Sequence, residues 1–388
     1  MTDLPKQLGV IGAGTMGAGI AQLGALAGIE TVLHDPIPEA LEKGLAGIHS
    51  NVDKGAERGR WSADDAATAH EKISVADSLD GLAECELVVE AAPERLDLKR
   101  ELFENLSRIC GPGTVLATNT SSIPVTQIAS AAAEPENVVG LHFFNPAPLM
   151  KLVEVIAALQ SGERALAIAR ATGEAMGKQV IDAADGPGFL VNRCGRPFGS
   201  EALRLLQEQV ATLEEIDRIY RVGGGFRMGP FELMDLVGID VGFAVAKSFM
   251  ELSFGEPRWK PSPLQAKMVA AGRLGRKTGR GWYDYSGDGP HRPDDEPDAV
   301  LSGEESDILE RVLACIVNEA AFALGEGVGS AEDIDTGTTL GLNWPRGPIA
   351  WGREIGFDRV LATLDDLHDF YREERYRAAP LLRRGTLS

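Results

Sequence analysis

Cysteine and long apolar segments are scarce in this sequence of 388 residues. The cysteines are Cys85, Cys110, Cys194 and Cys315. Their wide spacing excludes a zinc ribbon and their small number excludes a disulfide scaffold, so we expect free thiols, no bound metal and a cytoplasmic location. No apolar run reaches the roughly 18 residues that a membrane-spanning helix needs. The first residues, MTDLPKQLGVIG, lack a basic segment followed by an apolar one, so no signal peptide is expected.

Positive charge is also in deficit. Lys and Arg number 38 against 58 Asp and Glu, a formal net charge of −20, and such a surface on average repels nucleic-acid phosphates. Hydrophobic residues make up 44% of the chain and charged residues 25%, which is typical of neither a disordered nor a membrane protein. A chain of this length can form two or three domains. We therefore expect a globular protein with no nucleic-acid or membrane partner.

The N-terminal region alternates strands and helices. Residues 8–11, LGVI, have the pattern of a buried strand, residues 12–17, GAGTMG, that of a glycine turn, and a helix and a second strand follow. The alternation continues for about 180 residues, which predicts a Rossmann-like α/β domain over residues 1–184 with a doubly wound, mostly parallel sheet. Charged helical segments in residues 38–71 predict a helical hairpin inserted in this domain.

The C-terminal half has a different and duplicated pattern. Residues 185–286 are predicted to be almost entirely helical, and their sequence returns in residues 304–388. Ten identities recur at a constant offset of 118 positions without a gap, among them Asp217 with Asp335. The acidic segment between the copies, residues 287–303, is rich in Pro and Gly and is interpreted as a linker. These patterns predict a duplicated all-α C-terminal domain.

The glycine turn has the form of a dinucleotide-binding site. Gly12 permits the tight turn, Gly14 lets the backbone approach a pyrophosphate, and Gly17 lets the helix pack on the strand. Asp35 ends the second strand, where an acid binds the adenosine ribose and repels a 2′-phosphate, so NAD is favoured over NADP. The order of strand, turn, helix, strand and Asp argues against glycines that serve only a packed turn. The predicted cofactor set of this turn is Gly12, Gly14, Thr15, Met16, Gly17 and Asp35.

One His and one Glu interrupt the apolar segment GLHFFNPAPLMKLVEVI. VVGLHFF is a predicted strand, Pro146 and Pro148 end it, and KLVEVI is a returning strand. This arrangement brings His142 and Glu154 side by side. A carboxylate that holds one imidazole nitrogen fixes the tautomer and raises the basicity of the other, as a general base in hydride transfer requires. The alternative is a structural core His beside a Glu that pairs with Lys151.

Polar residues follow another predicted strand. TNTSSIP, residues 118–124, places Asn119 and Ser121 at a strand carboxyl end, where ligands bind in open α/β sheets. Such groups can serve a nicotinamide ring and a reacting oxygen. The alternative for Ser122 is an ordinary helix N-cap. Asn192, in GFLVNR, faces the cleft if the two domains pack in the usual way, and is otherwise a capping or interhelical residue.

Five motifs occur together and in order: GAGTMG, TNTSSIP, LHFFNPAPLMKLVEV, GPGFLVNR and MGPFELMD. With them the chain resembles the L-3-hydroxyacyl-CoA dehydrogenases, closely over residues 8–285 and more loosely over the second repeat. RPFGSEALRLLQE and PSPLQAKMVAAGRLGRKTGRGWYDY are most similar to the bacterial 3-hydroxybutyryl- and 3-hydroxyadipyl-CoA branch. The resemblance implies an NAD-dependent enzyme that oxidises an (S)-3-hydroxyacyl-CoA of short or dicarboxylic chain in fatty-acid or aromatic catabolism.

The resemblance also implies roles for individual residues. At the reaction centre it implies the base His142, its partner Glu154, and the hydrogen-bonding groups Ser121, Asn145 and Asn192. Contacts with the nicotinamide half of NAD are implied for Glu94, Lys99 and Asn145, and Lys277 is implied to approach the cofactor from the helical domain. The hairpin corresponds to the arm that holds the CoA tail, where Ser50 and Lys54 are the expected contacts. The dense basic run common in this arm is absent from the sequence.

Further expectations concern the repeats and the substrate. In single-copy relatives the helical domain supplies the dimer contact, so the duplicated domain is expected to pack on itself as a pseudo-dimer, in a monomer or a homodimer. The second copy has Glu310 where the first has Asn192, and no second active site is expected there. A dicarboxylic acyl chain needs a basic group in its pocket, for which the candidates are Arg193, Arg196 and Arg227.

Two other functions are open at this point. A dehydrogenase of a free hydroxy or sugar acid, similar to lambda-crystallin, keeps the glycine turn, His142 and Glu154 but needs no CoA arm. A catalytically silent NAD-binding protein is expected to lose the His, Glu and Asn set, and all of that set is present.

Overall fold

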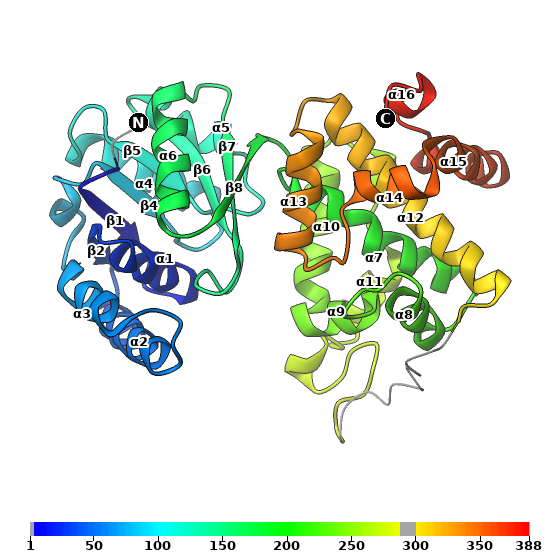
Figure 1. Cartoon of the computed structure of the whole chain (residues 1–388), viewed down its shortest axis with the longest axis horizontal. Coiled ribbons are helices and arrows are strands. Elements are labelled where there is room, and N and C mark those ends of the chain that lie inside the picture. Colours follow the sequence, from blue (N-terminus) through cyan, green and yellow to red (C-terminus); the bar gives the residue numbers. More distant parts are fainter. Residues whose placement is uncertain (1–3, 288–299, 388) are drawn as a thin grey trace. The chain divides into compact units, whose positions relative to one another are not determined.

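The computed structural model describes residues 4–287 and 300–387. The chain divides into two compact units, residues 1–189 and 190–388 (Figure 1). The first unit is an α/β domain and the second is helical. This division falls slightly after the predicted boundary at residue 184. Most of the predicted linker lies outside the described part of the chain.

The first unit is built on one eight-stranded sheet with the strand order β3-β2-β1-β4-β5-β6-β7-β8. Neighbouring strands are parallel except β6 and β7. The strands are β1 (Gln7–Ile11), β2 (Glu30–His34), β3 (Ile73–Ala76), β4 (Leu87–Glu90), β5 (Val115–Thr118), β6 (Val138–Phe143), β7 (Leu152–Ala157) and β8 (Gln179–Ala184). The helices are α1 (Thr15–Leu26), α2 (Pro38–Glu57), α3 (Ala63–Lys72), α4 (Leu96–Ile109), α5 (Val125–Ala129) and α6 (Glu163–Ala175). The predicted Rossmann-like, mostly parallel sheet is confirmed.

The sequence patterns explain these elements. Strand residues such as Leu8 and Val89 are fully buried, because helices cover both faces of a parallel sheet. The predicted helical hairpin consists of α2 and α3 and is confirmed. Pro38 begins α2, where its fixed φ suits the first helical position. Ser62 and Asp65 form a capping box at the start of α3.

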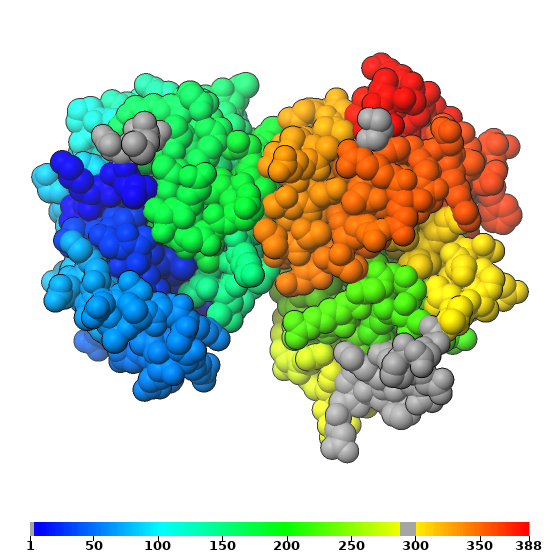
Figure 2. Space-filling model, in the orientation of Figure 1, coloured from blue at the N-terminus to red at the C-terminus, as the bar shows by residue number. Residues whose placement is uncertain are grey.

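The second unit consists of helices around a core of its own. Its first copy contains α7 (Val191–Gln207), α8 (Leu213–Val222), α9 (Pro230–Val237), α10 (Ile239–Leu252) and α11 (Pro263–Ala270). Its second copy contains α12 (Gly303–Gly325), α13 (Ala331–Gly341), α14 (Pro348–Ile355), α15 (Phe357–Tyr371) and α16 (Pro380–Arg383). The surfaces of the two copies, bright green and orange, meet on one face (Figure 2). Among the described helices, none has the length and apolar character needed to cross a bilayer.

The two copies use the same helix cap. Asp217 accepts hydrogen bonds from two backbone amides in the first turn of α9, and Asp335 accepts them from the equivalent amides of α14. Gly229 and Gly347 stand directly before these helices, and a Cβ on either would lie 2.2 Å from the Asp side chain. The identities Asp217/Asp335 and Gly229/Gly347 therefore correspond to the same helix cap in both copies.

Each copy also contributes an arginine that pairs with a glutamate of the other copy. Arg193 Nε lies 2.8 Å from Glu319 Oε1, and Arg311 Nε lies 2.6 Å from Glu201 Oε1. The offset of 118 converts one pair into the other, so the packing of α7 on α12 is isologous, as in a symmetric dimer. Arg193 is thereby committed to a buried structural pair. The prediction that Arg193 could bind the carboxylate of a dicarboxylic acyl chain is therefore wrong.

Candidate active site

His142 and Glu154 lie side by side in the sheet. Strands β6 and β7 are antiparallel, and these two residues are direct partners in the register. Antiparallel partners project from the same face of a sheet, and His142 Nδ1 lies 2.7 Å from Glu154 Oε2. The residues are 5% and 0% exposed. Strand β6, the turn and the returning strand β7 thus place His142 beside Glu154, as predicted.

The carboxylate determines which imidazole nitrogen carries a proton. A carboxylate only accepts hydrogen bonds, so Nδ1 of His142 donates to Glu154 and Nε2 carries the lone pair. The rings of Phe144 and Phe189 lie 4.6 and 5.8 Å from the His142 ring and cover its flanks. In such apolar surroundings a nearby negative charge strongly stabilises an imidazolium. The arrangement suits a base that takes one proton at Nε2.

The TNTSSIP loop is held by the carboxylate of Glu94. Its Oε1 accepts hydrogen bonds from the Thr120 hydroxyl at 2.7 Å, the Ser121 amide at 3.0 Å and the Ser122 hydroxyl at 2.8 Å. Ser121 is exposed after the end of β5. The alternative prediction that Ser122 caps the following helix is wrong, because the first two amides of α5 donate to Asp185 instead.

Lys99 is buried and paired. Its Nζ lies 2.7 Å from Glu90 Oε1 and 3.4 Å from Glu94 Oε2, and its side chain is 1% exposed. Burial opposes the ionisation of Glu94, but the Lys99 ammonium and the hydroxyl donors of the loop hold the pKa of that carboxyl below its usual value. Lys99 therefore supports the loop through Glu94. Its burial argues against the direct contact with NAD that the resemblance implies.

Asn119 and Asn145 follow strands β5 and β6 and lie in different environments. Asn119 Oδ1 accepts a hydrogen bond from the Phe143 amide at 2.8 Å, which ties the end of β5 to the residue after His142. Asn145 is exposed in the loop that follows β6. Ser121 and Asn145 are therefore the exposed polar groups at the carboxyl ends of β5 and β6, the edge where ligands bind open α/β sheets.

The glycine turn forms a cradle at the start of α1. Gly12 has a φ of +98°, and a Cβ there would lie 2.7 Å from a backbone oxygen. A Cβ on Gly17 would lie 1.8 Å from the Gly12 oxygen, whereas one on Gly14 would project into open space. Asp35 Oδ2 accepts a hydrogen bond from the Ala13 amide at 2.8 Å, beside the turn. No side chain caps α1, so its first amides are available to an anion, and the turn fits the pyrophosphate of NAD.

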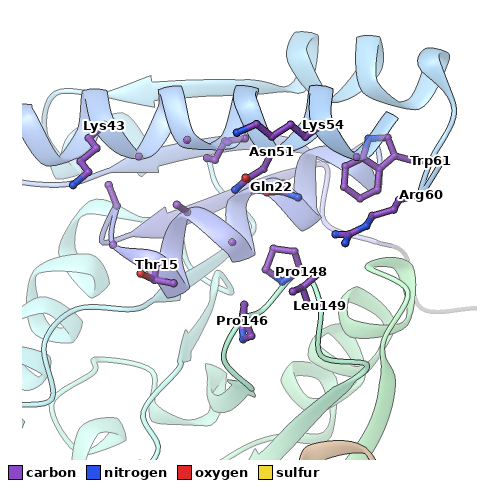
Figure 3. A pocket seen from close by; sticks show the side chains of 18 of the residues that line it. Thr15, Gln22, Lys43, Asn51, Lys54, Arg60, Trp61, Pro146, Pro148 and Leu149 are labelled. Carbon is purple, nitrogen blue, oxygen red and sulfur yellow. The ribbon is translucent and has the colours of Figure 1, made fainter. Parts of the chain in front are cut away.

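A cavity of about 610 Å³ lies between α1, α2 and the loop that contains Pro146 and Pro148 (Figure 3). Thr15 lines it, while Met16 packs against the core of the sheet. Lys54, which the resemblance implies as a CoA contact, also lines it, but Ser50 does not. The other polar or aromatic side chains from the arm are Lys43, Asn51, Arg58, Arg60 and Trp61.

Sequence reasoning missed most of this basic lining. Lys43, Asn51 and Lys54 recur at helical spacing on one face of α2, and that period is the signal that identifies them. Arg60 and Trp61 follow in the turn after α2, and Arg60 reaches toward the proline loop (Figure 3). Trp61 Nε1 donates to a carbonyl of α2 at 2.8 Å and so holds the turn in place. The cationic surface thus arises from spaced, not consecutive, basic residues.

Two predicted site residues belong to the second unit. Asn192 lines a cavity of about 780 Å³ within that unit. Lys277 is exposed, and its Nζ lies 2.6 Å from Asp240 Oδ1. This pairing lowers the pKa of the Asp240 carboxyl. A contact between Lys277 and NAD would therefore have to compete with Asp240.

The first unit combines the features of one class of protein. A dinucleotide cradle follows β1, an acid follows β2, and a histidine held by a carboxylate lies near the carboxyl end of β6 in the same sheet. These are the features of an NAD-dependent dehydrogenase that removes a hydride from an alcohol carbon.

The chain belongs to the 3-hydroxyacyl-CoA dehydrogenase family. The family model of the NAD binding domain matches residues 7–186, and the model of the C-terminal domain matches residues 188–285 and again residues 308–386. The protein is therefore an NAD-dependent 3-hydroxyacyl-CoA dehydrogenase.

Known proteins resemble the chain over most of its length. It is 38% identical to the 3-hydroxyadipyl-CoA dehydrogenase of Escherichia coli K12 over 98% of both chains. It is 40% identical to a probable 3-hydroxybutyryl-CoA dehydrogenase of Bacillus subtilis, over 72% of this chain and 97% of that one. The crystal structure of a 3-hydroxybutyryl-CoA dehydrogenase from Escherichia coli K12 is similar with a TM-score of 0.91 at 37% identity, over 99% of this chain and 98% of that chain.

Proposed function

We propose that this enzyme oxidises (S)-3-hydroxyacyl-CoA thioesters of short or dicarboxylic chain, with His142 as the base. The observation that carries this proposal is the hydrogen bond of 2.7 Å between His142 Nδ1 and Glu154 Oε2. It lies in a buried position at the carboxyl edge of the sheet that also carries the glycine turn. A histidine held in this way can take a proton at Nε2 and return it in the reverse direction.

In the oxidation, His142 Nε2 takes the proton of the 3-hydroxyl as the C3–H bond breaks. NAD, when bound at the glycine turn, supplies the hydride acceptor. The electron pair of the O–H bond forms the second bond of the C3 carbonyl, so one hydride and one proton leave the alcohol. Glu154 stabilises the positive charge that His142 acquires. The family resemblance assigns Ser121 and Asn192 to hydrogen bonds with substrate oxygens, and Asn145 would contact the nicotinamide when NAD is bound.

The cavity beside α2 is proposed to hold the CoA tail. Its basic side chains are Lys43, Lys54, Arg58 and Arg60, and such groups bind phosphates through charge-assisted hydrogen bonds. Trp61 offers an aromatic ring to the adenine. A free hydroxy acid does not need this arm. The cavity therefore favours a CoA thioester over the alternative of a dehydrogenase similar to lambda-crystallin.

Removing two cations from this cavity tests the CoA site. The double substitution Lys54→Met and Arg60→Met is expected to raise the KM for acetoacetyl-CoA about tenfold, because phosphate contacts are lost. The N-acetylcysteamine thioester of the same acyl group has no phosphates, so its KM should be the same for both enzymes. Lys72→Met, which removes an α3 lysine paired with Glu30, is the control. Equal KM values of the wild type and the double variant for acetoacetyl-CoA would contradict this site.

The acyl chain is proposed from the relatives. A 3-hydroxyadipyl-CoA dehydrogenase is similar over nearly the whole chain, and 3-hydroxybutyryl-CoA dehydrogenases are similar over about three quarters of it. Initial rates with NADH should therefore be measured for acetoacetyl-CoA, 3-oxohexanoyl-CoA, 3-oxoadipyl-CoA and free acetoacetate. Turnover of the CoA thioesters is expected. Turnover of the free acid alone would indicate a hydroxy-acid dehydrogenase, and no turnover would indicate a silent NAD-binding protein.

We also propose that the enzyme is a monomer in which the helical copies form an intramolecular pseudo-dimer. The reciprocal pairs of Arg193 with Glu319 and of Arg311 with Glu201 support this, because an isologous face buried within one chain is unavailable to a second chain. Light scattering is expected to give the mass of one chain. A homodimer assembled through the first copy would contradict the proposal.

We further propose a cytoplasmic location. Cys85 and Cys110 are free thiols. Burial raises the pKa of Cys85 to about 12 and that of Cys110 to about 11, which keeps both thiols protonated and unreactive. Unpaired and unreactive thiols are typical of proteins in a reducing compartment.

A further inference from the structure

One arginine of the second unit differs from its neighbours. Four buried or partly buried arginines each bind at least one glutamate: Arg193, Arg204, Arg258 and Arg311. Arg196 lies on the same helix as Arg193, but its Nε is buried without a hydrogen-bond partner among the described residues. Its guanidinium lies 5.0 Å from the centre of the Phe249 ring. A buried cation without a counter-ion is costly, so this site suits an anionic ligand.

Arg196 lines the same cavity of about 780 Å³ as Asn192. The two residues are four positions apart on α7, so they share one face of the helix and are about one turn, or roughly 6 Å, apart along its axis. Apolar side chains, among them Met234, Val241 and Val245, line the cavity around them. Burial lowers the pKa of Arg196 to about 10, which leaves the guanidinium charged at neutral pH.

The other charged side chains that line this cavity are paired or exposed. Arg204 and Glu373 bind each other at 2.6 Å. Arg375 lies 3.4 Å from a buried glutamate, and Lys260 and Glu374 are exposed. Among the described residues, Arg196 is therefore the cation of this cavity that has a buried Nε and no protein counter-ion.

We propose that Arg196 binds the terminal carboxylate of a dicarboxylic 3-hydroxyacyl-CoA and selects this substrate class. The inference rests on the proposed function, in which the family resemblance assigns Asn192 to a hydrogen bond with a substrate oxygen. An acyl chain that runs from there along α7 brings a carboxylate three carbons beyond C3 to the guanidinium one helical turn away. The planar guanidinium can donate two parallel hydrogen bonds to that carboxylate. An uncharged chain leaves the buried Nε of Arg196 without a partner, and this difference is the basis of selection.

The test compares two substrates of equal chain length in the NADH-dependent direction, 3-oxoadipyl-CoA and uncharged 3-oxohexanoyl-CoA. The wild-type kcat/KM ratio is expected to favour the dicarboxylic substrate by about 10²-fold, the size of effect typical of a buried, charge-assisted contact. Arg196→Leu is expected to lower this ratio by a similar factor. Arg196→Lys keeps the charge but not the planar fork, so it should lower the ratio less.

Arg204→Leu is the matched control, because Arg204 lines the same cavity but is paired with glutamates. Its ratio should equal that of the wild type. If Arg196→Leu does not fold, inhibition of the wild type by adipyl-CoA and by hexanoyl-CoA provides the test, and adipyl-CoA is expected to bind more tightly. Equal inhibition by both thioesters, or a ratio near one in the wild type, would overturn the role of Arg196. A lack of turnover of both 3-oxo substrates would instead overturn the proposed function.

Discussion

Replacement of His142 by Gln is expected to lower kcat by about 10² to 10⁴-fold, the usual range for a lost acid–base group, with little change in the affinity for NAD. Gln cannot take the hydroxyl proton, but it is polar and fills much of the same space. The strand register that positions Glu154 depends on β6 and β7 and not on the imidazole. Turnover of acetoacetyl-CoA with NADH measures the loss, and a fluorescence titration with NADH measures cofactor binding.

The control for this substitution is His368→Gln, which lies in helix α15 of the second unit. The kcat of this variant should equal that of the wild type. A His142→Gln enzyme with nearly normal kcat would end the assignment of His142 as the base. If cofactor binding and kcat fell together, the role of His142 would be structural.

Replacement of Lys99 by Met is expected to lower the free energy of unfolding by about 3–5 kcal/mol. The substitution leaves the Glu90 carboxylate, which is 0% exposed, as a buried charge without its cation. The Thr118 hydroxyl and the Ala92 amide remain as its donors and cannot neutralise it. Urea denaturation of the full-length enzyme, followed by circular dichroism, measures the loss.

Two further variants separate burial from cofactor binding at Lys99. Arg95→Met breaks an exposed pair with Asp97 and is expected to change stability little. Lys99→Met combined with Glu90→Gln removes both charges, so part of the lost stability should return. If Lys99→Met weakened NAD binding but left the unfolding free energy unchanged, the direct contact implied by the family resemblance would be correct.

The sequence pattern was sufficient to predict those parts of the site whose residues lie close together along the chain. The pairing of His142 with Glu154 could be predicted, because strand side chains alternate with a period of two and a short turn leaves few registers. The cradle could be predicted because only glycine tolerates the backbone approaches at Gly12 and Gly17. The same reasoning failed for Ser122, since helix α5 takes its cap from Asp185, 60 residues away along the chain.

The sequence by itself determined the order of strands and helices, the dinucleotide turn and the duplication of the helical domain, since each is a repeated period or a short motif. Tertiary structure alone decided the role of each charged residue. Arg193 and Arg196 are three positions apart on one helix, yet Arg193 meets Glu319 and Arg196 faces a cavity. Lys99 likewise meets a carboxylate on a neighbouring strand. Pairing of this kind depends on which distant segments pack together, and the spacing of residues along one helix does not contain that information.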